Sequence, residues 1–91
     1  MTARKPANAA AAEATATPIP FEFDGQSYSI LPSSEWSFDA LDSLEQNRIA
    51  TFLREVLGDD SLATFKATKP KIADAARLAQ TALEAAGIRG N

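Results

Sequence analysis

The sequence predicts an α+β fold, mainly helical, in which an N-terminal β-hairpin packs on a small bundle of three to four helices. Three observations predict it. The segment FEFDGQSYSI (residues 21–30) places alternating apolar residues on both sides of Asp24-Gly25. After Pro32, apolar residues recur at helical spacing in four segments. Residues 1–18 are rich in Ala, Thr and Pro, with no large apolar side chain beyond the initial methionine, and this composition predicts a disordered leader.

The hairpin is predicted over residues 19–31. Asp24-Gly25 is typical of a type I′ turn, because both central positions of that turn need positive φ. Closing the chain there pairs Phe21 with Tyr28. Alternation then puts one set of side chains on an apolar face, namely Ile19, Phe21, Phe23, Tyr28 and Ile30. The opposite face is polar, with Glu22, Ser27 and Ser29. Since a lone hairpin is marginal in water, its apolar face is expected to cover the helices.

Helices are predicted at about 38–45, 47–57, 60–66 and 69–86. Ser37 and Asn47 are the expected N-caps of the first two, and Gly58 is expected to supply a left-handed stop. Thr68 is expected to cap the last helix, with Pro70 in its first turn. These segments form one predicted domain over 19–87, followed by a flexible tail at 88–91.

The aromatic residues of these elements are predicted core residues, because a domain this small has few other large side chains: Phe21, Phe23, Tyr28, Phe38, Phe52 and Phe65. Trp36 lies in a polar loop and has two interpretations. It either fills the seam between the hairpin and the first helix, or it presents an anchor to a partner.

The last predicted helix has a broad face of small residues that ends at Gly87. Alanines let backbones approach closely but bury little area each. Two interpretations stay open, packing inside the domain and a helix-on-helix contact with another chain. The candidate partner-binding residues are Trp36, Ala75, Ala79, Ala82, Ala86 and Phe21.

Composition argues against an enzyme. The chain has 91 residues, no cysteine and no histidine, which excludes disulfides and the common zinc sites and removes the usual general base. Asp59-Asp60 is the only adjacent carboxylate pair, and a helix start explains it more simply than a metal site does. We therefore expect no catalytic residue, no metal and no cofactor.

The charge balance argues against nucleic acid. The formal net charge is −3, from 9 basic and 12 acidic residues. Lys66, Lys69 and Lys71 cluster in the sequence and are interpreted as a solvent-exposed loop and helix start. No signal peptide or apolar run of membrane-spanning length is found in the sequence. A cytoplasmic protein without a membrane partner is expected.

Residues 20–87 resemble the tail assembly chaperones of long-tailed bacteriophages, especially the small ones of phages that infect actinobacteria. The features that carry the resemblance are a short aromatic strand, DGQSYSI, a proline, SEWSFDALDSLEQ, REVLGDDSLATF and an Ala-rich helix that follows Thr-x-Pro and ends in Gly. The Ala/Thr/Pro leader is longer than the domain of that family requires.

The resemblance implies a non-enzymatic protein of the host cytoplasm that is absent from the finished virion. Such chaperones bind the long apolar tape measure protein, keep it soluble, and help the tail tube protein to polymerise around it. The family commonly makes a short product and a longer frameshift product that share the N-terminal domain. The end at IRGN is typical of the short product. Self-association into a homo-oligomer is also expected.

Two other functions are compatible with the sequence. A hairpin with short helices is compatible with a small DNA-binding regulator of the winged-helix type, although Arg48, Arg54 and Glu55 offer little for base contacts. A structural head or tail connector of the virion is the second alternative. Its presence in purified particles would distinguish it from a chaperone.

Overall fold

The computed structural model describes residues 15–88 of the chain. Most of the predicted leader (1–18) and of the predicted tail (88–91) therefore lies outside the described residues. Within the leader, residues 15–18 are described and are exposed.

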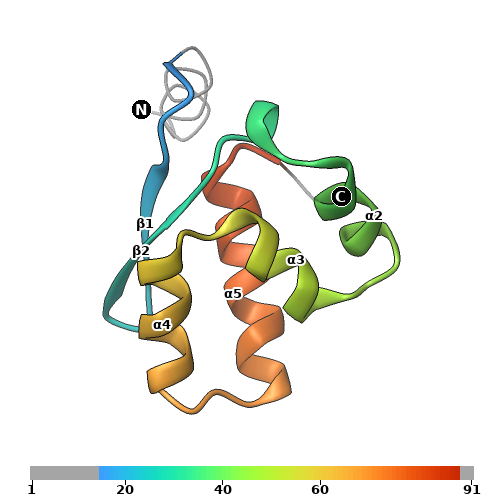
Figure 1. The fold of residues 1–91 in the computed structure, drawn as a ribbon. Coiled ribbons are helices and arrows are strands. Elements are labelled where there is room, and N and C mark those ends of the chain that lie inside the picture. Colours follow the sequence, from blue (N-terminus) through green and yellow to red (C-terminus); the bar gives the residue numbers. More distant parts are fainter. Residues whose placement is uncertain (1–14, 89–91) are drawn as a thin grey trace.

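The architecture is the expected α+β fold, mainly helical, with one antiparallel hairpin followed by four helices (Figure 1). The strands are β1 (Ile19–Phe23) and β2 (Gln26–Ile30). A single 3-10 turn, η1 (Ser33–Glu35), occupies part of the predicted loop. The helices are α2 (Phe38–Glu45), α3 (Ile49–Val56), α4 (Asp59–Ala67) and α5 (Ile72–Ala85).

The hairpin has the predicted register, with Phe21 opposite Tyr28 and Phe23 opposite Gln26. Asp24 and Gly25 have φ values of 50° and 80°, so both turn residues occupy the left-handed region that a type I′ turn requires. The predicted apolar face is the inner one. Four of its five side chains are buried, and the fifth, Phe21, is half-buried.

The hairpin lies at one side of the helices (Figure 1). α4 and α5 pack against the strands, α3 packs on α5, and α2 packs on α3. Two backbone amides bond this part of the chain to the helices: the amide of Leu31 donates to the carbonyl of Val56 (2.9 Å), and the amide of Ser29 donates to Oγ of Ser61 (2.9 Å). The core lies between the strands, α3 and α5, and its fully buried side chains include Ile30, Phe52, Val56 and Leu78.

Two helix ends are as predicted. The hydroxyl of Ser37 accepts a hydrogen bond from the amide of Ala40 (3.0 Å) and so caps α2. Gly87 has a φ of 85°, as expected for the residue that ends α5.

The predicted start of the last helix is wrong. Thr68 ends α4, and its hydroxyl donates to the carbonyl of Phe65 (2.6 Å). Lys69 has a φ of 55°, Pro70 follows it, and α5 begins only at Ile72. A left-handed residue before a proline cannot belong to a right-handed helix, so the chain turns here before α5 begins.

The roles predicted for Asn47 and Gly58 are also wrong. Asn47 has a φ of 60° and makes the left-handed turn between α2 and α3, whose N-cap is Arg48. Gly58 has an ordinary φ of −71° and is the N-cap of α4. Asparagine tolerates the left-handed region, which explains how a non-glycine residue makes this turn.

The first helix packs through a different side from the one predicted. Phe38, predicted as core, is 77% exposed, and Leu41 is 44% exposed. The side of α2 that faces α3 carries Ala40 and Ser43, which are both buried. Small residues let α2 approach closely, and this leaves the larger side chains in solvent.

Candidate functional site

The carboxylates do not form a metal site in the part of the chain that the structure describes. No group of three or more acidic side chains there is placed to hold an ion. Asp59 and Asp60 are exposed in the first turn of α4, where negative charge interacts favourably with the helix dipole. This location agrees with the helix-start interpretation of the pair.

The alanines of α5 belong largely to the core. Ala79, Ala82 and Ala86 are each at most 3% exposed, whereas Ala75 is half-buried. The strands and α3 both pack on this helix. Packing within the domain therefore accounts for the three buried alanines, which leave no side-chain surface for a partner.

Trp36 fills the seam between the hairpin and the helices. Its indole Nε1 donates to the carbonyl of Leu31 (2.8 Å), and its ring makes a T-shaped contact with the ring of Phe52 at 5.3 Å between centroids. The side chain is half-buried. The two contacts satisfy both the polar and the apolar part of the indole, as the first of the two interpretations predicted.

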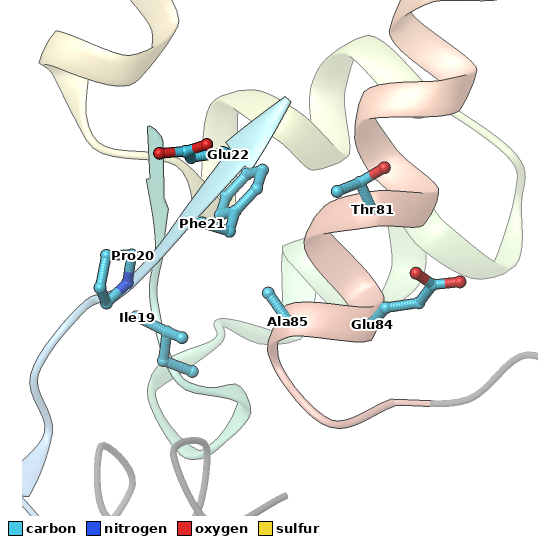
Figure 2. Close-up of a pocket in the computed structure, with 7 residues that line it drawn as sticks. All are labelled: Ile19, Pro20, Phe21, Glu22, Thr81, Glu84 and Ala85. Carbon is cyan, nitrogen blue, oxygen red and sulfur yellow. The ribbon is translucent and has the colours of Figure 1, made fainter. Parts of the chain in front are cut away.

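Phe21 lies beside an open hollow between β1 and α5 (Figure 2). Its ring stacks on Tyr28 at 5.8 Å and lies opposite Thr81 and Ala85 of α5. This β1–α5 hollow has a volume of about 230 Å3 and is lined by Ile19, Pro20, Phe21, Glu22, Thr81, Glu84 and Ala85. Its lining is mostly apolar, and the carboxylates of Glu22 and Glu84 point away from the gap between β1 and α5 (Figure 2).

A second, larger hollow of about 300 Å3 lies among α3, α4 and the start of α5. Its apolar walls include Leu53, Leu62, Phe65, Pro70 and Ile72. Three cations line it, namely Arg54 of α3, Lys66 of α4 and Lys71, the N-cap of α5, and no carboxylate is among the described residues that line it. We call this the basic-rimmed hollow. Ile72 is 91% exposed there.

The outer side of α2 has the opposite charge. Phe38, Leu41, Asp42 and Glu45 follow one another at spacings of three, one and three residues, which places them on one side of a helix. We call this stripe the acidic α2 face. Residues 33–46 contain four carboxylates and neither lysine nor arginine.

A charge cluster also joins the hairpin turn to α5. Arg77 bonds Asp24 (3.1 Å) and Asp74 (3.0 Å), and its guanidinium lies 4.9 Å from the centre of the Phe23 ring. The amide of Lys71 donates to Asp74 (3.0 Å), and this bond, followed by the one from Arg77, lowers the pKa of Asp74. These contacts fix the N-terminus of α5 against the turn.

The pKa of Tyr28 is raised, mainly because its ring is buried and secondarily because of the charge of Asp24. The phenol therefore stays neutral at physiological pH. Tyr28 acts in this fold as a packing residue, with its ring against Phe21, Phe23 and Phe65.

No protein-family model, curated protein or solved structure matches this chain. Among residues 15–88, no helix is both long enough and apolar enough to cross a membrane.

Of the predicted site residues, Ala75 lines the basic-rimmed hollow and none lies on the acidic α2 face. Part of the signal was visible, since Lys66, Lys69 and Lys71 cluster in the sequence. The sequence could not show that Arg54 joins two of these lysines, because that depends on how α3 packs beside α4 and α5. The predicted set divides between the core (Ala79, Ala82, Ala86), the seam (Trp36), the β1–α5 hollow (Phe21) and the basic-rimmed hollow (Ala75).

Proposed function

We propose that this protein is a non-enzymatic tail assembly chaperone of a long-tailed bacteriophage, which holds the tape measure protein in the host cytoplasm while the tail tube polymerises. It acts as the short product of a frameshifted pair and leaves before the virion is complete. The proposal rests on the resemblance of residues 20–87 to that family and on one surface feature of this domain.

That feature is the β1–α5 hollow. It is open to solvent, mostly apolar, and beside Phe21, a half-buried aromatic residue of the predicted partner-binding set. A hollow of about 230 Å3 suits one apolar side chain of a partner and not a whole small-molecule substrate. Each contact is therefore weak.

Weak contacts fit the proposed task. A long helical partner presents similar apolar side chains many times along its length. Several chaperone copies bound to one partner chain would therefore retain it far better than one copy does, if those copies also contact one another.

Co-expression with the tape measure protein of the same genome tests the proposal. Thr81→Tyr places a ring in the β1–α5 hollow, and Thr64→Tyr makes the same change at a half-exposed threonine of α4 that lines neither hollow. We expect the wild type and Thr64→Tyr to keep the tape measure protein soluble and to co-purify with it. Thr81→Tyr should remain folded and lose it.

Two results would count against the proposal in different ways. If a folded Thr81→Tyr variant retains the tape measure protein fully, the contact lies elsewhere. If the wild type neither solubilises nor binds that protein, the chaperone function is wrong. Recovery of the chain in purified particles would instead favour the connector function.

A further inference from the structure

The acidic α2 face and the basic-rimmed hollow both expose apolar side chains and carry opposite charges. The α2 face presents Phe38 and Leu41 beside Asp42 and Glu45. The hollow presents apolar walls beneath three cations. An apolar stripe with flanking carboxylates is the ligand that an apolar hollow with a cationic rim would recognise.

Within one chain the two surfaces do not meet. α2 packs on α3, and none of its residues lines the basic-rimmed hollow. Contact between them therefore requires two molecules.

Each surface also disfavours contact with its own copy. Residues 33–46 carry four carboxylates and no base, so two α2 faces repel one another. Two basic-rimmed hollows likewise bring three cations against three. Repulsion between like charges thus disfavours a symmetric dimer through either surface and favours an asymmetric contact.

We infer that this chain self-associates head to tail, with the acidic α2 face of one copy seated in the basic-rimmed hollow of the next. Phe38 and Leu41 enter the hollow and meet Ile72 and Leu62, while Asp42 and Glu45 face the cations of the rim. Because the two surfaces differ, each bound copy leaves one of each kind free, and the contact continues from copy to copy. The inference holds whether or not the tape measure protein is a partner.

The contact should be weak. A helix of eight residues spans only about 12 Å, so the buried area falls below that of a standard interface. We expect a dissociation constant on the order of 10 μM to 1 mM. Because the rim charges are exposed, raising the salt concentration from about 0.05 M to about 0.5 M should weaken association several-fold.

Complementation between two variants tests the inference by analytical ultracentrifugation. Phe38→Asp disables the α2 face and Ile72→Asp disables the hollow, and both residues are so exposed that the fold should be unaffected. We expect the wild type to form concentration-dependent oligomers, and each variant alone to associate at least about tenfold more weakly. An equimolar mixture retains one intact contact and should give dimers and nothing larger.

Charge reversal gives a second measurement. Lys66→Glu should weaken association, and adding Glu45→Lys to the same chain should restore it, whereas Lys69→Glu, outside the lining of the hollow, should change little. Circular dichroism melting of every variant checks folding. Leu41→Asp and Ile72→Ser replace either aspartate variant that fails to fold.

Three results would overturn the inference. The wild type could stay monomeric up to about 1 mM chain at low salt. The mixture of the two aspartate variants could form no dimer or form larger oligomers. Alternatively, duplex DNA could bind the wild type and not Lys66→Glu while the protein alone stays monomeric, and the basic-rimmed hollow would then be a nucleic-acid surface.

Discussion

Replacing Gly25 with alanine tests whether the hairpin depends on the backbone conformation of its turn. Gly25 has a φ of 80°, and a Cβ added there would meet no atom within 4 Å. The substitution therefore adds strain without a steric clash with neighbouring side chains. Holding an L-residue in the left-handed region costs about 1–2 kcal/mol, so Gly25→Ala should lower the free energy of unfolding by about 1 kcal/mol. In a domain of this size that corresponds to a fall in Tm of about 4–8 °C.

A graded series separates backbone strain from other effects. Gly25→Asn should cost less than Gly25→Ala, because asparagine tolerates the left-handed region, and Gly25→Val should cost more because valine is β-branched. Gly58→Ala is the matched control, since Gly58 has a φ of −71° and equally open space around it. Reduced entropy of the unfolded chain and the poorer N-cap act in opposite directions there, so the change should stay within about 0.5 kcal/mol.

Urea and thermal unfolding of the four variants, followed by circular dichroism, provide the measurement. The expected order of stability is wild type, Gly25→Asn, Gly25→Ala and Gly25→Val, with Gly58→Ala close to the wild type. The reasoning fails if Gly25→Ala is as stable as Gly58→Ala. It also fails if Gly25→Asn is the least stable of the three turn variants.

Three further predictions follow from side-chain contacts. Ala79→Glu should unfold the domain at 25 °C in circular dichroism, since it buries a carboxylate in the core, whereas Ala76→Glu on the exposed side of α5 should fold. Trp36→Phe should cost about 1 kcal/mol in urea unfolding, because phenylalanine cannot donate to the carbonyl of Leu31. The folded-state pKa of Asp74 lies below its usual 3.8, so the stability from its ionised form is present above that pH and is lost as pH falls through the folded value. Asp74→Asn should lower Tm at neutral pH and flatten the acid-side decline in Tm.

The parts of the fold that local chemistry determines were predictable from the sequence. The Asp24-Gly25 turn sets the register, and the register sets which side chains face the core, so the hairpin followed from ten residues. The role of Ser37 as an N-cap was predictable for the same reason, because it depends only on the Ser37 hydroxyl and on an amide three residues later.

The orientation of α2 could not be predicted in this way. Helical spacing shows that Phe38, Leu41 and Leu44 lie along one side of a helix, but not that this side packs. The structure buries Ala40 and Ser43 and leaves Leu44 only half-buried. The choice of side depends on the rest of the core, which a local pattern does not contain.

The predicted start of the last helix was wrong because other local interactions act at the same residues. Thr68 is a good N-cap residue type, and Pro70 is acceptable in a first turn, so both signals favoured an early start. Lys69 instead takes a left-handed conformation, and Asp74 accepts the amide hydrogen of Lys71. The carboxylate of Asp74 thus bonds the residue that precedes the observed start of α5. It also bonds Arg77, which in turn bonds Asp24 of the hairpin turn.

The candidate site follows from how this small domain divides its side chains between core and surface. Buried alanines on α5 seat the hairpin closely, so the monomer is held by aromatic and aliphatic residues of the strands and α3. Phe38 and Ile72, being mostly exposed, contribute little to that core. Burying a side chain of this size in a contact with another molecule would stabilise the contact by up to about 1.5–3 kcal/mol. The acidic α2 face and the basic-rimmed hollow therefore carry exposed apolar side chains that a second molecule could bury, whereas Ala79, Ala82 and Ala86 do not.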